Sequence, residues 1–346
     1  MEEVRVRFTI SLSIGMHEIT IIGAGVAGLC VARELLNHGA NIVLVDRHGI
    51  NGPHSCSWWA GGMLAPFCEG ESAEEPVVRL GCEAAEWWET QIDAVYRCGS
   101  LVVSPSRDAS ELARFERRTT GHVKVNAVEI SKLEPDLGDR FNKGLFFEKE
   151  AHLSPRLALD QLRENILKDG ARFLQDDADP GEYAKKGLTI DCRGLQAKRD
   201  LKDIRGVKGE MLILSCPDVN LNRPIRMLHP RVPLYIVPRG DGLFMLGATM
   251  VEGQAGKHVS ARALLELLSA AYALNPAFGQ AEVLEIGVDN RPAFPDNLPR
   301  IRREGHIVRV NGLFRHGFLL APALARMVAD HIFKNQTPEV MDETTA

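Results

Sequence analysis

The first clear pattern of hydrophobic positions in the chain predicts a strand, a helix and a second strand in direct succession. Residues 18–22 form a short apolar run typical of a buried strand. Residues 26–38 repeat apolar side chains at helical spacing, and Gly39 stands where the end of a helix favours glycine. Residues 41–45 form a second apolar run, which ends at Asp46. This order is typical of a βαβ unit.

A strand-like alternation precedes this unit. Apolar residues alternate with polar ones from residue 4 to residue 14, which is the period of two expected of a strand. Arg5 and Arg7 interrupt the apolar stretch, so the segment does not resemble a signal peptide. An added edge strand and an upstream extension with the true start at Met16 both fit the pattern. The sequence leaves this choice open.

The rest of the chain predicts strands and helices in mixed order. Residues 47–70 are rich in glycine and other turn-forming residues and predict a loop region. Strands are expected at 101–104, 123–130, 144–148, within 207–250, at 283–288 and at 307–311, and helices at 74–97, 109–119, 157–167, 261–274 and 320–333. Parallel βαβ character therefore lies at the two ends of the chain, and an antiparallel pattern fills the middle.

This distribution predicts an α/β fold made of two domains that interleave along the chain. A discontinuous Rossmann-like cofactor-binding domain is expected to combine residues 16–80, 144–200 and 285–335. An inserted α+β substrate domain that contains an antiparallel sheet is expected to combine residues 81–143 and 201–284.

Composition and charge narrow the classes of function. The 346 residues are 45% hydrophobic and 25% charged, which is ordinary for a globular protein with ample core. A net charge of -5 without a basic tract argues against nucleic acid as a partner. No apolar run approaches the roughly 18 residues needed to span a membrane. Seven widely spaced cysteines without a C-x-x-C motif favour a reduced cytoplasmic protein with no metal site.

The turn between the first strand and the first helix carries a dinucleotide-binding fingerprint, Gly23-Ala24-Gly25-Val26-Ala27-Gly28. Gly23 permits the tight turn, Gly25 lets the backbone approach a pyrophosphate, and Gly28 allows the helix to pack closely on the strand. The N–H groups at the helix start favour an anion. Asp46 is expected to accept hydrogen bonds from ribose hydroxyls. These features predict a dinucleotide but do not choose between NAD and FAD.

Three further segments carry the motifs of a known flavoprotein family. They are the loop His54-Ser55-Cys56-Ser57-Trp58-Trp59-Ala60-Gly61-Gly62-Met63-Leu64-Ala65-Pro66, the hairpin Leu234-Tyr235-Ile236-Val237-Pro238-Arg239 with Leu246-Gly247-Ala248-Thr249-Met250, and the C-terminal signature Arg291-Pro292-x-x-Pro295-Asp296-Asn297-Leu298-Pro299 with Gly312-Leu313-Phe314-Arg315-His316-Gly317-Phe318-Leu319-Leu320-Ala321-Pro322-Ala323. Together they resemble the D-amino-acid-oxidase-like FAD-dependent oxidoreductases. The resemblance extends over residues 18–333 and is strongest to the glycine oxidases of thiamine biosynthesis.

The resemblance implies FAD as the cofactor, with some departures from the family pattern. Asp46 stands where many members have Glu, which should preserve the ribose contact with a shorter reach. Asp191-Cys192-Arg193-Gly194 replaces the usual Ala-rich end of a strand in the flavin domain, which puts contacts there in doubt. Members with covalent flavin often attach it through a cysteine near the C-terminus, and none follows Cys216 in this chain. Non-covalent FAD is therefore expected.

Site residues are carried over from the family motif by motif. The expected FAD-binding residues are Gly23, Ala24, Gly25, Val26, Ala27, Gly28, Asp46, Arg47, Ala60, Gly61, Gly62, Met63, Arg315, His316, Gly317, Phe318 and Leu319. Arg291 aligns with the arginine that binds the substrate carboxylate, Tyr235 with a tyrosine that supports it, and Met250 with a residue that lines the pocket. A guanidinium suits a carboxylate because it donates two parallel hydrogen bonds.

The resemblance implies oxidative deamination of a small amino acid. Glycine is the expected substrate, with oxygen as acceptor and hydrogen peroxide and an imine as products, and the imine would feed thiazole formation in thiamine biosynthesis. Sarcosine, D-amino acids and proline-like amines are the alternative substrates. Pocket volume decides among them, and the sequence does not give the pocket volume. A non-catalytic flavin-binding subunit and an NAD-dependent dehydrogenase are hypotheses from other classes. A homo-oligomer is expected, since relatives of this family often form one.

Overall fold

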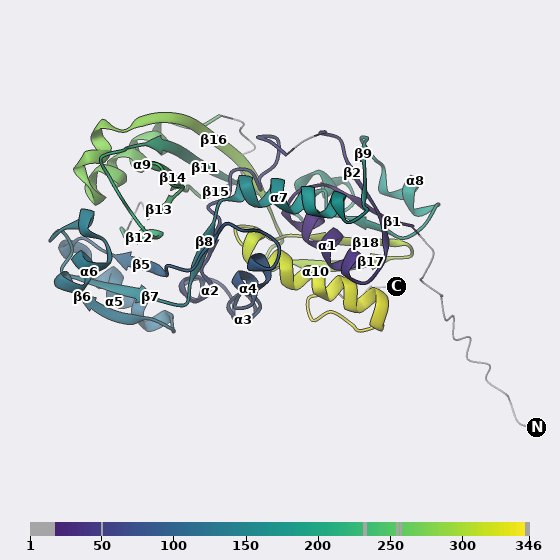
Figure 1. The fold of residues 1–346 in the computed structure, drawn as a ribbon, viewed down its shortest axis with the longest axis horizontal. Helices are drawn as coiled ribbons and strands as arrows, with labels where there is room; N and C mark the ends of the chain where they lie inside the picture. Colours follow the sequence, from purple (N-terminus) through teal and green to yellow (C-terminus); the bar gives the residue numbers. More distant parts are fainter. Residues whose placement is uncertain (1–17, 50, 231–233, 254–255, 257, 343–346) are drawn as a thin grey trace, which may run out of the picture.

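The computed structural model describes residues 18–49, 51–230, 234–253, 256 and 258–342. The alternating segment at residues 4–14 lies outside the described residues. The described chain forms an elongated molecule in which two β-sheets lie side by side along the long axis (Figure 1). A cavity lies between the two sheets, and residues from both of them line it.

The first sheet has six strands and lies in the right half of Figure 1. Its strands are β1 (Glu18–Ile22), β2 (Asn41–Asp46), β9 (Arg172–Gln175), β10 (Thr189–Asp191), β17 (Arg300–Glu304) and β18 (Ile307–Asn311). Their order across the sheet is β17-β18-β10-β1-β2-β9. All neighbours pair in parallel except β17, an antiparallel edge strand on β18. The carboxyl ends of β1 and β2 therefore lie at the same edge of the sheet.

Three helices form the layer beside this sheet: α1 (Val26–Asn37), α7 (Pro155–Lys168) and α10 (Gly317–Lys334). Helix α1 packs against both α7 and α10, and apolar residues from the helices and from β1 and β2 make one buried core. A fully buried Leu or Ile in such a core stabilises the fold by about 1.5–3 kcal/mol. Two short helices, α3 (Glu75–Gly81) and α4 (Ala84–Glu89), pack on α10 from its other side.

The second sheet has nine strands and lies in the left half of Figure 1. Its strands are β5 (Ser100–Val103), β6 (Val123–Asn126), β7 (Lys143–Phe147), β11 (Arg205–Ser215), β12 (Ile225–Met227), β13 (Leu234–Pro238), β14 (Leu243–Gly247), β15 (Val251–Glu252) and β16 (Glu282–Ala293). All of its pairs are antiparallel except β5 with β12. The helix α9 (Ala261–Leu274) packs on β13 and β14 and closes a second core.

Smaller elements connect the two halves. A three-stranded sheet has the order β3 (Met63–Leu64), β8 (Ala151–Leu153) and β4 (Val95–Tyr96). The remaining helices are α2 (Pro66–Glu69), α5 (Ala109–Arg118), α6 (Ala127–Leu133), α8 (Pro180–Ala184) and the 3-10 helices η2 (Ser106–Asp108), η3 (Pro135–Leu137), η4 (Gly194–Arg199) and η5 (Pro276–Gln280).

Two predicted elements were wrong. The single helix expected at 74–97 is instead α3, α4 and the strand β4. Both short helices are held on α10, since the indole N–H of Trp88 donates to the Phe318 carbonyl (2.9 Å), and this tertiary packing outweighs local helical propensity.

The strand expected at 123–130 stops at residue 126, where α6 begins. The side chain of Asn126 accepts hydrogen bonds from the N–H groups of Val128 and Glu129, and the Glu129 carboxylate accepts one from the Asn126 N–H. A capping residue followed three positions later by Glu is a sequence signature of a helix start. The signal was present in the sequence.

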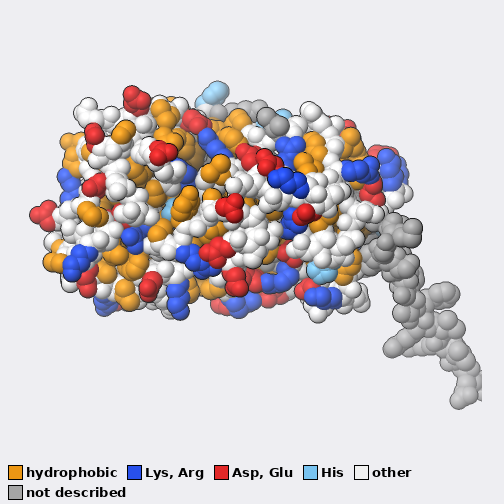
Figure 2. Space-filling model, in the orientation of Figure 1, with side chains coloured by type: hydrophobic (Ala, Val, Ile, Leu, Met, Phe, Trp, Pro, Cys, Tyr) orange, Lys and Arg blue, Asp and Glu red, His pale blue; other side chains and the backbone are white. Residues whose placement is uncertain are grey.

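The fold class predicted from the sequence is confirmed as mixed α/β, with a mainly parallel sheet built from distant segments and a mainly antiparallel second sheet. The domain boundaries themselves stay a prediction. On the face shown in Figure 2, Lys and Arg side chains alternate with Asp and Glu, without a large patch of either sign. Within the described residues, no helix is both long and apolar enough to cross a membrane.

Candidate functional site

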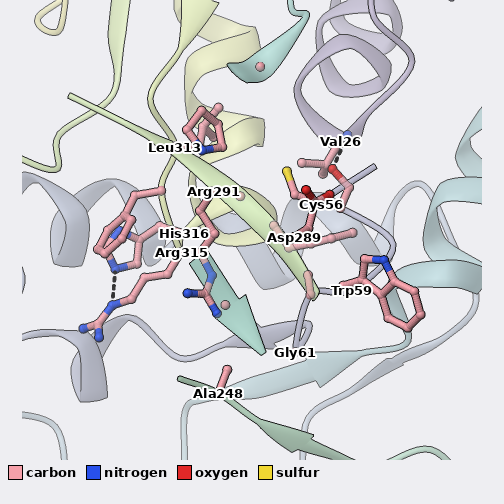
Figure 3. A pocket seen from close by; sticks show the side chains of 18 of the residues that line it. Val26, Cys56, Trp59, Gly61, Ala248, Asp289, Arg291, Leu313, Arg315 and His316 are labelled. Atoms are coloured by element: carbon pink, nitrogen blue, oxygen red, sulfur yellow. Dashed lines mark hydrogen bonds between the residues drawn. The ribbon is translucent and has the colours of Figure 1, made fainter. Parts of the chain in front are cut away.

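A long cavity of about 1120 Å³ runs between the two sheets. One end is lined by the glycine turn after β1 and by Asp46 at the end of β2. The other end is lined by Tyr235 of β13 and Arg291 of β16, and the start of α10 forms part of the wall (Figure 3). The cavity is therefore built by both sheets.

The glycine turn forms the first end of the cavity. Gly23 has φ +103°, which favours glycine, and a Cβ there would come within 2.6 Å of the Cys192 carbonyl oxygen. A Cβ at Gly28 would overlap the Gly23 carbonyl, so helix and turn touch only because both residues lack side chains. Gly25, Val26 and Ala27 line the cavity at the start of α1. The first N–H groups of a helix lack intrahelical partners and attract anions.

Asp46 organises this end through its carboxylate. One oxygen accepts a hydrogen bond from the Ala24 N–H and the other from the His48 N–H, each at 2.8 Å. The carboxylate thus ties the end of β2 to the glycine turn of β1. Each carboxylate oxygen accepts more than one hydrogen bond, so acceptor capacity remains for hydroxyl groups of a ligand.

The loop after β2 forms the wall between the two ends. The Ser57 hydroxyl accepts a hydrogen bond from the Val26 N–H (3.1 Å), which anchors this loop to the start of α1. Farther along, the Arg239 guanidinium donates to the carbonyls of Gly61 (2.8 Å) and Leu153 (3.0 Å). Burial lowers the pKa of Arg239 to about 10. Arg239 therefore holds in place the glycine-containing loop that lines the cavity.

Arg291 lies at the second end of the cavity, where its side chain covers Gly209 of β11. A Cβ at Gly209 of β11 would overlap the Arg291 guanidinium, which therefore lies flat over the β11 backbone. One of its nitrogens donates to the Thr249 carbonyl (3.2 Å). No ion pair to Arg291 occurs among the described residues, so its remaining donors stay available to an anion in the cavity.

Tyr235 and Met250 lie at the same end. A Cβ at Gly61 would come within 3.0 Å of the Tyr235 ring, so this ring packs on the loop held by Arg239. Met250 lines the cavity from just beyond β14 and keeps 57% of its surface exposed. The exposure indicates a position at the rim of the cavity, in place of the core packing that a methionine often has.

The start of α10 joins the cavity through a buried charged cluster around Glu69. One carboxylate oxygen of Glu69 pairs with Arg226 of β12, and the other accepts from Arg315 (2.7 Å) and lies 2.9 Å from the Nε2 of His316. Burial alone would raise the pKa of Glu69, but Arg315 and Arg226 hold it well below its usual value. Burial lowers the pKa of His316. Glu69 thus links α2 to β12 and to the residues just before α10 through ion pairs.

His316 has a further feature that points to a ligand. Its Nδ1 is buried and has no hydrogen-bond partner within the described part of the chain, while the residue lines the cavity. The same Nε2 lies 2.9 Å from Glu69 and 3.3 Å from Arg315 Nε, so Nδ1 of the neutral ring is an acceptor when Nε2 donates to Glu69 and a donor when Nε2 accepts from Arg315. A buried polar atom without a partner is costly, so a group bound in the cavity is expected to meet it.

Most residues expected at the site line this single cavity. Gly23, Gly25, Val26, Ala27, Asp46, Arg47, Ala60, Gly61, Gly62, Met63, Tyr235, Met250, Arg291, Arg315, His316, Gly317, Phe318 and Leu319 are among its lining residues. Ala24 and Gly28 are not, because they support the turn from behind. Their roles toward a ligand stay predictions.

Four residues at the cavity or its support were missed from the sequence: Ser57, Glu69, Arg239 and Asp289. Each lies in or beside a motif segment; the partners of Ser57, Glu69 and Arg239 are distant in the chain, whereas Asp289 is bonded by the N–H of the next residue, Asn290. Burial raises the pKa of Asp289 to about 6, although the Asn290 N–H and Arg291 oppose the shift. Within the described ranges, no group of three His, Cys, Asp or Glu side chains is arranged to hold a metal ion.

Comparison with protein families gives one match over almost the whole described chain. Residues 18–331 match the family described as FAD dependent oxidoreductase. FAD fits this cavity. The start of α1 suits a pyrophosphate, the Asp46 carboxylate suits ribose hydroxyls, and the cavity continues from these groups to Arg291. The partnerless Nδ1 of His316 is a further atom that a bound cofactor would satisfy.

Individual relatives match over nearly their full length. The putative thiamine biosynthesis oxidoreductase ThiO of Rhizobium etli is 51% identical over 92% of this chain and 97% of its own. The glycine oxidase of Bacillus licheniformis is 33% identical over 92% and 94%. The crystal structure of glycine oxidase from Bacillus cereus superposes with a TM-score of 0.80 at 21% identity, covering 95% and 100%.

Proposed function

We propose that this chain, which belongs to the FAD dependent oxidoreductase family, oxidises glycine to its imine and returns the electrons to oxygen as hydrogen peroxide. FAD is its cofactor, and amino-acid oxidation is the chemistry named for its relatives. The observation that carries the proposal is the position of Arg291 and Tyr235 together at the end of the cavity opposite Asp46.

Binding and orientation are the tasks of the protein in this reaction. FAD supplies the hydride acceptor. Arg291 would grip the substrate carboxylate with two parallel hydrogen bonds, since its guanidinium lies open to the cavity. The Tyr235 hydroxyl would add a hydrogen bond to the same carboxylate. Held in this way, an α-amino acid would have its α-carbon fixed in one orientation for hydride transfer.

The reaction removes a hydride from the α-carbon and a proton from nitrogen. The amino group must therefore be neutral when the hydride leaves, and the C–N single bond becomes a double bond. Oxygen takes up two electrons and two protons to give hydrogen peroxide. We further propose that the imine feeds thiazole formation in thiamine biosynthesis, supported by the 51% identity to a relative with that name.

Four amines separate the substrate hypotheses in one experiment. The purified yellow protein is mixed anaerobically with glycine, sarcosine, D-alanine and D-proline, and the flavin absorbance is followed. Glycine should bleach the flavin fastest, and air should restore the colour with one peroxide formed for each glycine consumed. Faster bleaching by D-proline than by glycine would overturn the choice of glycine alone.

A control for this experiment uses reduction by dithionite, which needs no substrate site. A protein that dithionite bleaches and that none of the four amines bleaches would contradict amino-acid oxidation as a whole. A homo-oligomeric assembly and a cytoplasmic location stay predictions.

A further inference from the structure

Asp289 is a charged residue in the cavity wall to which the proposed reaction assigns no role. It lies on β16, where alternate residues face the same side, so Asp289 shares a face with Gly287 and Arg291, and Asp289 and Arg291 line the cavity. Across the pair with β11, Asp289 stands opposite Gly209, which has no side chain. The carboxyl group therefore meets no neighbour from β11 on this face.

The loop after β2 covers Asp289 from the opposite side. A Cβ at Gly287 would overlap the Trp59 indole, so this ring packs directly on β16. The contact brings Cys56 beside Asp289, as Figure 3 shows. Burial, followed by the charge of Asp289, raises the pKa of the Cys56 thiol to about 12. Cys56 is therefore a neutral neighbour at physiological pH.

No cation neutralises Asp289 at contact distance among the described residues. One carboxylate oxygen accepts a hydrogen bond from the Asn290 N–H (2.7 Å), and the charge of Arg291 acts on it without forming an ion pair. Lys208 and Glu210 flank Gly209 on β11 but point to the other face, where they pair with each other (2.9 Å). Burial without a paired cation raises the pKa of Asp289 to about 6.

Asp289 lies along the stretch of the cavity that leads from the helix start toward Arg291. The pyrophosphate belongs at Gly25 and Val26, and the substrate end is marked by Arg291. In Figure 3, Asp289 lies between Val26 and Arg291. A cofactor that extends from the helix start to Arg291 must pass this carboxyl group.

We propose that Asp289 controls how readily the bound flavin is reduced, by opposing its reduction as a carboxylate and ceasing to oppose it as a neutral acid. Reduction of the flavin to its anionic form takes up two electrons and one proton and adds one negative charge. A carboxylate in a low-dielectric wall repels that charge. When Asp289 takes up a further proton, the repulsion ends.

The sign of the pH dependence follows from linkage. Below about pH 6 Asp289 is already neutral in the oxidised protein, so it has no effect on the midpoint potential. At higher pH it is ionised, and the added charge on reduction raises its pKa further. Between the two pKa values, reduction takes up two protons in place of one. Well above both, the potential is lowered by a constant amount.

The test compares holoenzymes in a dye-coupled redox titration between pH 5 and pH 9. The variants are Asp289→Asn, which removes the charge, and Glu282→Gln, a matched control at the exposed start of the same strand. At pH 8, Asp289→Asn should shift the equilibrium about tenfold toward reduced flavin, or about 30 mV for two electrons. At pH 5 wild type and Asp289→Asn should coincide, and Glu282→Gln should match wild type throughout.

Two results would overturn the proposal. One is a midpoint potential of Asp289→Asn that equals wild type at pH 8. The other is a shift of equal size at pH 5 and pH 8, which would indicate a structural change. Asp289→Glu, which keeps a carboxyl group, should retain the pH-dependent step. The proposal rests on FAD in this cavity but not on the substrate, because the dye reduces the flavin, so it can fail separately from glycine oxidation.

Discussion

The two ends of the cavity are built in different ways. The end at Asp46 comes mainly from one continuous segment, residues 18–46, in which a strand, a turn, a helix and a strand follow each other, with Cys192 packed against the turn. The end at Arg291 combines β13, β16, a loop after β2 and the start of α10, which are far apart in the chain. The Asp46 end is therefore built mainly from neighbouring residues, whereas the Arg291 end forms only when distant segments of the chain come together.

The ends also differ in the groups that they present. At the first end the ligand meets backbone N–H groups at a helix start and one carboxylate that is itself held by two N–H groups. The second end uses charged side chains: Arg291 over Gly209, and Glu69 between Arg226 and Arg315. Backbone donors suit a phosphate of any nucleotide, whereas placed side chains select a substrate. The comparison therefore predicts that substitutions at Asp46 weaken FAD binding, whereas substitutions at Arg291 impair oxidation of the substrate.

The largest effect is expected for Arg291→Ala. Loss of the guanidinium removes the charge-assisted hydrogen bonds to a substrate carboxylate, so kcat/KM for glycine should fall roughly 10³-fold. FAD should remain bound, since the glycine turn and Asp46 are untouched. Steady-state kinetics and the flavin absorbance of the purified variant measure both. Release of the flavin by this substitution would contradict the separation of the two ends. Arg291→Lys is the control that keeps the charge without the fork.

Glu69→Gln should destabilise the fold by about 3 kcal/mol, because it removes a buried anion and leaves the partly buried Arg226 and Arg315 without their partner. The pKa of Glu69 is depressed in the folded protein, so its contribution is present above its unfolded value of 4.5 and is lost as the pH falls through the lower folded value. Urea unfolding should therefore show a gap between variant and wild type at pH 7 that narrows toward pH 3.

The control for Glu69 lies two residues farther along the chain. Glu71 pairs with the half-exposed side chains of Arg114 and Arg118. Exposed pairs contribute about 0–1 kcal/mol, so Glu71→Gln should stay close to wild type. Equal stability losses for Glu69→Gln and Glu71→Gln would show that burial of the Glu69 cluster does not matter.

Asp46→Ala is expected to have the smallest of these effects. It removes the acceptor for the Ala24 and His48 N–H groups and an acceptor for ribose hydroxyls, so the Kd for FAD should rise about tenfold. Once saturated with FAD, the variant should reduce with glycine at the rate of wild type. Fluorescence titration of the apoprotein measures the affinity, and Asp139→Ala, at an exposed position of the other half, is the control. A saturated variant with slow reduction would show that the two ends are coupled.

Much of the fold could be predicted because its signals are local. The elements β1, α1 and β2 agree with the sequence within a residue or so, since each is a single apolar run between turn residues. The strands β9 and β17 were not predicted, and for β10 only its end was indicated, by the family motif that begins at Asp191. They are short, and β9 is exposed at most of its positions, so no apolar pattern marks them. Pairing with a neighbouring strand makes them part of the sheet.

The residues around the cavity divide in the same way. Arg291 and Tyr235 stand in recognisable motifs, but the open space over Gly209 depends on a strand that lies some eighty positions away in the sequence. Arg239 looked like the end of a hairpin, and its task became clear only from its hydrogen bonds to the Gly61 and Leu153 carbonyls. A side chain that acts on a distant backbone leaves no periodic signal in the sequence.

The sequence by itself determined the βαβ unit and the dinucleotide fingerprint, because these depend on glycine at a few turn positions and on short apolar runs, and the resemblance of three further motif segments indicated the flavoprotein family. The tertiary structure alone decided which charges meet. Glu69, Arg226 and Arg315 pair because α2, β12 and the residues before α10 converge on one point, and Asp289 lies beside Cys56 with no cation in contact with it among the described residues. Electrostatic energy depends on the distance between charges and on their burial, and the order of the residues specifies neither.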